Sequence, residues 1–378
     1  MTARERGGGR QRLRGLIRKE SLQIMRDPSS ISIAFVLPIV LLLLFGFGVS
    51  LDAKHVPVAL VVENPTVEST SFVASLVGSP YFAPVILRAR PPAERALVAG
   101  EVNAIVVLRA DFARRIHAPR GAPIQVIVNG TDANTARIIA GYVDGAWQKW
   151  LTQYDRDRGG TISPPVVVEQ RVWFNAEVRS RNFLVPGLIA IIMTLIGTLL
   201  TAMVVAREWE RGTMEALMVT PVRIGEILLG KLIPYFVLGM GGMAVSTAMA
   251  VWVFQVPFRG SLLVLLVLST LFMLASLGMG LLISTIARNQ FVAGQVAIIV
   301  AFLPAFILSG FIFDITSMPV AVQIITHIIP ARYFVSSLQT LFLAGTVWPI
   351  FIVDAAALAL MAAIFLGLTR RKTHKLLE

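Results

Sequence analysis

Cysteine is absent from this chain of 378 residues. Its absence excludes a disulfide framework, a cysteine-ligated zinc site and thiol catalysis. Charged residues are scarce as well, at 15% of the chain, where soluble proteins carry about 25%. The four histidines are scattered, no His-Glu-x-x-His helix occurs, and no serine is flanked as in a nucleophile elbow. We therefore predict neither a hydrolytic centre nor a metal site.

Apolar residues make up 56% of the chain, and its mean hydropathy is +0.74. They gather in about six runs of the length that crosses a bilayer, which is ~20 residues. We predict an all-α polytopic membrane domain of six transmembrane helices in contact with lipid. The first run is too long for a typical signal-peptide core and is interpreted as an uncut anchor. The predicted spans are Ile31–Val49, Phe183–Ala206, Ile233–Phe254, Leu262–Ile286, Phe291–Phe313 and Pro349–Leu368.

The net charge of +12 is compatible with nucleic-acid binding, but the basic residues lie beside the apolar runs. They are interpreted as topology determinants and lipid contacts, and no nucleic-acid partner is predicted. Lys and Arg gather in residues 1–30, in loop 207–231 and in the tail 370–378. Both termini are therefore predicted to be cytoplasmic.

Residues 1–30 are predicted to form a cytoplasmic tail and an interfacial helix. Leu13, Leu16, Ile17 and Ile24 recur on one helical face among basic residues, a pattern typical of helices that lie on a membrane surface. The alternative is a basic tail that only sets the topology.

Residues 50–181 are the one large region between apolar runs, and they are predicted to form an α/β extracytoplasmic domain inserted between the first and second spans. Residues 182–369 then hold the other five spans. Within the inserted domain, β-branched runs bounded by turn residues predict strands, and helical spacing predicts helices. The strands are Val56–Val62, Val102–Leu108 and Ile124–Val128; the helices are Val67–Val77, Ala93–Ala99 and Asp132–Tyr154.

A short polar segment between the second and third spans is the most informative part of the chain. It carries polar groups at Glu208, Glu210, Arg211 and Glu215, while Met214, Leu217 and Met218 make an apolar face at helical spacing. Thr213 after Gly212 is predicted to cap the helix, and Pro221 to stop it. Such a helix, placed between two spans, is predicted to contact a partner.

Gly225–Lys231 fits the first part of a phosphate-binding loop. However, Leu232 stands where Ser or Thr would hold magnesium, and no strand precedes the segment. We reject nucleotide binding here, so any ATP that drives this protein must be bound by another chain.

Two further sets of residues are predicted within the spans and near their outer ends. Ser276, Gly280 and Ser284 recur every fourth residue, which allows close helix packing; a substrate path is the alternative. Segment 314–347 is broken by prolines and is predicted to be re-entrant in the outer leaflet. An outer ion pair is predicted for Arg332 with Asp354, near Asp314; a substrate or proton site is the alternative.

Several segments together resemble the type-2 ATP-binding-cassette (ABC) exporter permeases. The signature is Glu210-Arg-Gly-Thr-Met-Glu-Ala-Leu217, with Pro221, Glu226 and Lys231 downstream. The stretch from Lys19-Glu20 to Arg26-Asp27-Pro28 resembles their interfacial helix. Pro330-Ala-Arg-Tyr-Phe-Val335 and Leu341-Phe-Leu-Ala-Gly345 resemble the bacterial multidrug-type subgroup, which carries a large external domain after the first span.

The resemblance implies a subunit of the bacterial cell (inner) membrane that exports a hydrophobic or amphipathic substrate by alternating access. It implies a dimer with a second copy or a paralogue, and a separate ABC ATPase that binds the ATP and magnesium. The external domain would gate release or dock a periplasmic adaptor. The implied ATPase-coupling residues are Arg207, Glu208, Glu210, Arg211, Gly212, Thr213, Glu215, Leu217 and Pro221.

Two other classes stay open. One is a secondary transporter or channel, although the spans hold few ionisable residues and show no inverted repeat. The other is a membrane-anchored receptor that uses the external domain, although no cytoplasmic output domain is present.

Overall fold

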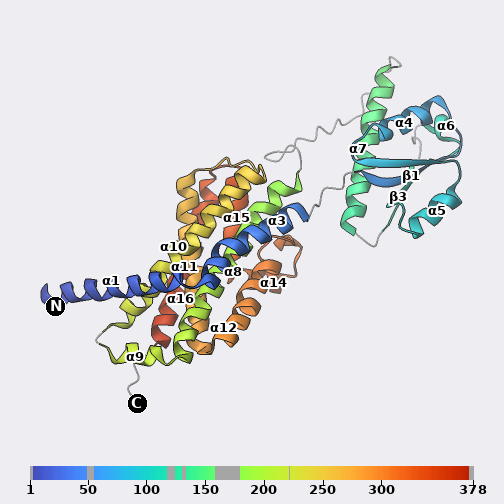
Figure 1. Ribbon diagram of the computed structural model, residues 1–378. Helices are drawn as coiled ribbons and strands as arrows, with labels where there is room; N and C mark the ends of the chain where they lie inside the picture. The colour runs from blue at the N-terminus through green and yellow to red at the C-terminus, as the bar shows by residue number, and fades with distance from the viewer. Residues whose placement is uncertain are drawn as a thin grey trace. The chain divides into compact units, whose positions relative to one another are not determined.

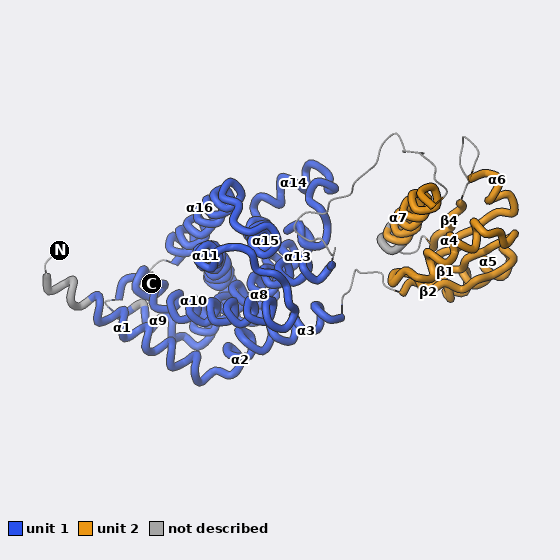
Figure 2. Tube along the Cα trace, turned by 90° about the horizontal axis from the view of Figure 1, so that it is seen from above, with its two compact units in different colours: residues 1–50, 172–378 blue, residues 51–171 orange. Residues whose placement is uncertain are grey.

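The computed structural model describes residues 3–48, 55–116, 124–129, 133–157, 179–220 and 222–373. The chain divides into two compact units, shown in blue and orange in Figure 2. Unit 1 comprises residues 1–50 and 172–378, and unit 2 comprises residues 51–171. Unit 2 is thus inserted in the sequence between the first and second membrane-length helices.

In its described residues, unit 1 holds six helices long and apolar enough to cross a membrane. Two of them, α8 (Ser180–Glu210) and α11 (Leu262–Ala287), pack on each other at the centre of the bundle. In the most apolar stretch of α8, 83% of the residues are buried, whereas only 17% are buried in the corresponding stretch of the first span. The other helices surround this pair (Figure 1). They are α2, η1 and α3 (Pro28–Gly48), α10 and η2 (Ile224–Val253), α12, η3 and α13 (Gln290–Leu308), and α16 (Trp348–Lys372).

The helices differ from the predicted apolar spans mainly at their ends. The third begins at Ile224 rather than Ile233, because the Glu226 carboxylate accepts the backbone N–H of Arg223 and caps the polar first turn. The fifth ends at Leu308 rather than Phe313, where the chain turns through Gly310 at φ +87°. A π-helical turn, η3 (Ile298–Phe302), precedes Pro304 in this helix, as expected where proline removes a backbone donor.

The N-terminal helix α1 (Ala3–Met25) packs along α10. Gly230 of α10 permits this close approach, because a Cβ there would lie 2.8 Å from the Cβ of Leu16. Leu16 was expected on a lipid-facing side of the helix. Instead it faces another helix, and Ile24 is buried in the core of unit 1.

The proline-rich segment before the last span folds as short helices. They are η4 (Ile315–Ser317), α14 (Val320–Thr326) and α15 (Pro330–Leu343). The last of these packs against α8, α11 and α16. Its Phe334 stacks on Phe272 of α11 with ring centroids 4.0 Å apart.

Unit 2 contains a four-stranded sheet in the order β2-β1-β3-β4. β1 (Val56–Val62) pairs in parallel with β2 (Phe82–Leu87) and β3 (Ala104–Leu108), and β3 pairs antiparallel with β4 (Ile124–Val128). The unit's helices are α4 (Val67–Val77), α5 (Arg90–Val98), α6 (Phe112–Ile116) and α7 (Ala133–Asp157).

One face of the sheet packs on an aromatic core that α4, α6 and α7 supply. Phe72 lies at its centre, with Trp147 and Trp150 edge-on at 5.5 Å between ring centroids. A smaller core on the other face is contributed by β1, β3 and α5. The predicted α/β character of this region is confirmed, with β2 and α6 added.

Candidate functional site

The corner between α8 and α9 (Thr213–Val219) is the polar segment that the sequence singled out. Gly212 makes this corner in the left-handed conformation, at φ +67°. It occupies the N-cap position itself, so the predicted N-cap at Thr213 is wrong. The Thr213 hydroxyl instead donates to the carbonyl oxygen of Glu208, at 3.2 Å, and ties the start of α9 to the end of α8.

One side of α9 is fixed to the bundle and another side is open. Met214 is buried at 1% exposure, and Leu217 packs against the same core. Ala216 and Val219 are exposed, the latter at 75%. The helix is therefore held by apolar contacts and still presents a free surface. The side chain of Glu215, and Pro221 altogether, lie outside the described residues.

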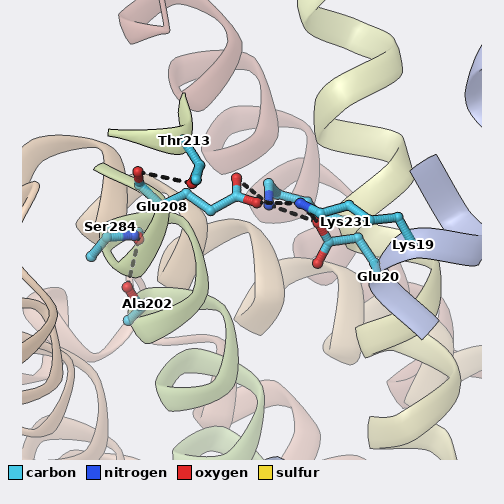
Figure 3. Close-up of polar contacts among 8 residues, drawn as sticks. Lys19, Glu20, Ala202, Glu208, Thr213, Lys231 and Ser284 are labelled. Carbon is cyan, nitrogen blue, oxygen red and sulfur yellow. Dashed lines mark hydrogen bonds and ion pairs between the residues drawn. The ribbon is translucent and has the colours of Figure 1, made fainter. Parts of the chain in front are cut away.

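Four charged side chains from three helices meet beneath this corner (Figure 3). Lys231 of α10 pairs with Glu20 of α1 at 3.0 Å and with Glu208 of α8 at 2.5 Å. Lys19 of α1 lies 2.7 Å from Glu208 and 3.1 Å from Glu20. We call these four residues the ion quartet.

Three members of the ion quartet are buried, and the fourth, Lys19, is 45% exposed at its edge. The charges balance, with two ammonium groups against two carboxylates. Lys231 and Glu20 are 2% exposed and Glu208 is 4% exposed. A buried charge without a partner costs several kcal/mol, so each member needs the others. The quartet therefore fixes α1, the end of α8 and the start of α10 to one another.

Further ionic contacts surround the quartet. Arg207 pairs with Asp27 at 2.9 Å, and Arg12 pairs with Glu226 at 3.3 Å. On the opposite side, Glu210 accepts the backbone N–H of Gln290, the first residue of α12, at 3.0 Å. The end of α8 is thus bound to α1, α10 and α12.

The pKa values of Lys19 and Asp27 are both shifted. Burial alone would lower the pKa of the Lys19 ammonium, but the carboxylates of Glu208 and Glu20 outweigh burial and raise it. Burial would raise the pKa of Asp27, but hydrogen bonds from Arg207 and Ser30 outweigh it and lower the pKa. Both shifts favour the charged forms.

A groove of about 1040 Å³ runs between α1 and α9. Its floor includes members of the ion quartet, and its rim includes exposed residues of α9. Both signs of charge and several apolar groups line it, a composition suited to a protein segment. The lining residues are Lys19, Leu22, Gln23, Arg26, Asp27, Arg207, Glu208, Arg211, Thr213, Ala216, Leu217 and Thr220.

A family model described as ABC-2 family transporter protein matches residues 28–371. The chain belongs to the ABC-2 transporter family. It is 48% identical to the probable multidrug ABC transporter permease YbhS of Escherichia coli (strain K12), over 97% of this chain and 98% of that relative. It is 29% identical to the probable multidrug ABC transporter permease YbhR of the same strain, over 94% and 98%. The inner membrane transport permease YhhJ, also of that strain, is 31% identical over 72% and 74%.

The sequence predicted which residues of this ABC-2 permease contact a partner. Some of them are exposed, and others are already engaged within the chain. Arg211, Gly212 and Thr213 are exposed, as is Glu210. Arg207 and Glu208, however, are occupied by contacts within the chain, and Glu208 is buried. Glu208 therefore supports the corner from inside rather than facing a partner.

The sequence analysis did not predict the ion quartet as a site, although it named all four of its members. Lys231 offered a signal, because a lysine at the start of an apolar span requires a counter-charge nearby. Its partner Glu20 lies 211 residues earlier in the chain, so spacing could not identify the pair.

The predicted pair between Arg332 and Asp354 is not formed in the described part of the permease. Arg332 lies in the first turn of α15 and bonds back to α14, at the Thr326 hydroxyl and the Gln323 carbonyl. Asp354 accepts the hydroxyl of Ser337, further along α15, at 2.8 Å. With Asp314, both residues nevertheless line one cavity of about 790 Å³.

The small-residue stripe of α11 lies against α8. A Cβ at Gly280 would collide with the Thr201 hydroxyl and the Thr198 carbonyl. The Ser284 hydroxyl donates to the carbonyl of Ala202 and accepts the N–H of Ala206. Ser276 lies opposite Gly197, where a Cβ would lie 2.8 Å from the Cβ of Ser276. These residues thus meet α8 at its closest approach to α11.

Proposed function

We propose that this chain is the permease subunit of an ATP-driven exporter that moves a hydrophobic or amphipathic substrate out of the cytoplasm or inner leaflet. Family membership and the permease names of the relatives support the class. A separate ABC ATPase docks on α9, and a second permease copy or paralogue completes the transport path. The dimer alternates between inward-facing and outward-facing states, biased by ATP on the partner.

The observation that carries this proposal is the construction of the corner. A coupling element must expose a contact surface and transmit force, so it must be rigidly fixed to the spans. α9 has an exposed face, a buried anchor at Met214 and the ion quartet directly beneath it. A loop that only connected two spans would need none of these buried charges, which are costly to assemble.

The geometry around Lys231 agrees with ATP and magnesium being held by the partner. The only phosphate-loop match in the sequence ends at this lysine. Its ammonium group is buried and contacts Glu20 and Glu208. It is therefore unavailable to a phosphate group, and we assign no cofactor to this chain.

The positive-inside rule supports cytoplasmic termini and a cytoplasmic α9 in the bacterial inner membrane. Unit 2 would then be extracytoplasmic, where it could gate release or dock a periplasmic adaptor. Against a transporter that works without ATP, or a receptor, stands the family match across residues 28–371.

Docking on α9 can be tested with one exposed side chain. Val219→Asp places a carboxylate on the free surface, where a docked partner would bury it without a counter-charge. We expect capture of the cognate ATPase by the permease to fall at least tenfold, equivalent to about 1.4 kcal/mol. Val98→Asp, at an 89% exposed position of unit 2, is the matched control.

Both variants should insert and elute as the unmodified chain does, since neither residue is buried. Substrate-stimulated ATPase activity should fall with Val219→Asp and persist with Val98→Asp. Full capture and transport by Val219→Asp would show that the ATPase docks elsewhere.

A further inference from the structure

A second groove, of about 1010 Å³, lies between the η2 end of α10 and the start of α11. It lies in the second half of this helix, away from α9, because its lining begins at Met240 whereas the helix begins at Ile224, about 24 Å earlier at 1.5 Å per residue. No charged residue lines it. Its apolar lining includes Met243, Val251, Trp252, Pro257, Leu265 and Leu266.

Two hydroxyl groups in this groove lack partners among the described residues. They belong to Thr247 of α10 and Ser269 of α11, and both oxygen atoms are buried. Ser269 is 1% exposed. Buried hydroxyls normally find a hydrogen bond, so two unbonded hydroxyls on residues that line the same apolar groove indicate a missing acceptor or donor.

Most other buried hydroxyls in the described part of the bundle are bonded, although that of Ser276, at the contact of α11 with α8, is not. Thr194 donates to the carbonyl of Ala190 at 2.8 Å, and Ser246 to that of Gly242 at 2.8 Å. This back-bonding to the preceding turn is the ordinary solution for Ser and Thr in membrane helices. Ser246 is the immediate neighbour of Thr247, so helical position does not explain why the Thr247 hydroxyl is unbonded.

The backbone also departs from regular helix beside the groove. α10 widens into the π-helical turn Met249–Val253, and Gln255 then adopts a positive φ of +54°. Trp252 stands at the rim and is 79% exposed. π turns are frequent at functional sites, and tryptophan is enriched at the boundary between lipid tails and headgroups.

The exposed apolar residues around this groove determine which kind of ligand can enter it. Leu262 and Leu266 in its lining are exposed at 70% and 59%, and Leu263 between them on α11 at 68%. In a membrane-embedded permease such a surface faces hydrocarbon. We propose that the groove binds one glycerophospholipid, with an acyl chain along the apolar walls and an ester carbonyl accepting from Ser269 and Thr247.

Photo-crosslinking in a bilayer tests this directly. The full chain is placed in nanodiscs of phosphatidylethanolamine and phosphatidylglycerol that contain a trace of phosphatidylethanolamine with a diazirine on one acyl chain. Labelled peptides are then mapped by mass spectrometry. We expect labelling of the groove to exceed labelling of the lipid-exposed face of α16 several-fold.

Two sets of variants distinguish a specific lipid-binding site from contact with bulk lipid. Ala244→Trp places a large side chain in the groove from an exposed position at its rim, and labelling of the groove should fall at least fivefold. Ala363→Trp, at an exposed position of α16, should leave labelling of the groove unchanged. Removing both hydroxyls without changing shape much, by Ser269→Ala with Thr247→Val, should weaken labelling by roughly fivefold or more, as loss of a hydrogen bond predicts. The double hydroxyl variant also tests the proposal if Ala244→Trp disturbs folding.

Three outcomes would overturn the proposal. One is labelling of the groove no stronger than that of α16, meaning bulk lipid only. Another is undiminished labelling in both Ala244→Trp and the double hydroxyl variant. The third is efficient disulfide dimerisation of Ala244→Cys in the cysteine-free chain, which would assign the groove to a second copy.

Discussion

At the scale of single residues, the ion quartet makes Lys231 the most demanding position in the chain. Lys231→Ala would leave Glu20 and Glu208 with only Lys19, an uncompensated buried charge. Removing one partner of a buried pair costs about 3–5 kcal/mol. We therefore expect a clear fall in the thermal unfolding temperature of the detergent-solubilised protein.

Two control variants distinguish charge balance from lost packing. Lys231→Met with Glu208→Gln removes one charge of each sign and should restore more than half of the loss, since neutral replacements of buried pairs are often tolerated. Arg90→Met breaks the exposed Arg90–Glu94 pair in unit 2 and should cost under about 1 kcal/mol. Equal losses for single and double variants would contradict this account.

The pKa shifts at Asp27 and Lys19 define a pH window. The pKa of Asp27 is lowered from 3.8, so its contribution to stability is present above that value and is lost as pH falls through the lowered pKa. The pKa of Lys19 is raised from 10.5, so its contribution is complete below that value and is lost as pH rises through the raised pKa. Unfolding temperature against pH should be flat between these limits. Asp27→Asn should reduce the loss of stability on the acid side alone, and Lys19→Met the loss on the alkaline side alone; no change in either curve would refute the linkage.

The sequence predicted only some of the contacts between individual residues. The polar corner was recognisable, because charges between two apolar runs stand out in the chain. The burial of Glu208 was not, since its counter-charges come from helices that only the fold brings together. Arg332 and Asp354 show the opposite case, in which two complementary charges lie near one cavity and each has a nearer partner.

At the scale of elements, Gly212 determines the direction in which α9 leaves α8. Its φ of +67° lies where other residues are strained, although no atom would collide with an added Cβ. Gly212→Val should cost about 1–2 kcal/mol locally and rotate or fray α9, so capture of the ATPase and transport should both fall. Gly100→Val, at φ +76° in open space in unit 2, imposes the same strain elsewhere.

Expression and membrane insertion should survive in both glycine variants. If Gly100→Val lowered ATPase capture as much as Gly212→Val, the effect would come from general instability rather than from α9.

The strands and helices of unit 2 show which elements the spacing of apolar residues can predict. Strand Val56–Val62 and helix Val67–Val77 were predicted with the bounds that the structure gives. Strand β2 was missed because Pro84 interrupts its pattern and its burial does not alternate. A proline fits there because β2 is an edge strand of the sheet, a position that sequence order alone does not reveal.

At the scale of the whole molecule, topology is the main expectation still to be measured. The cysteine-free sequence allows single-cysteine labelling without a background. Val98→Cys in unit 2 should react in intact cells with a reagent that does not cross the inner membrane, and Ala216→Cys in α9 should react only after that membrane is opened. Both positions are exposed, so accessibility within the fold does not limit either reaction. The reverse pattern would invert the orientation.

The ion quartet also has a consequence for how the chain is made. Glu20 leaves the ribosome 211 residues before Lys231, an interval of about 10–40 s at the usual rates of synthesis. During that time Glu20 must stay hydrated at the membrane surface, because it cannot be buried without the counter-charge that the later helix α10 supplies. A nascent chain stalled before α10 would therefore lack the partners that bury Glu20, and its α1 would stay open to proteases.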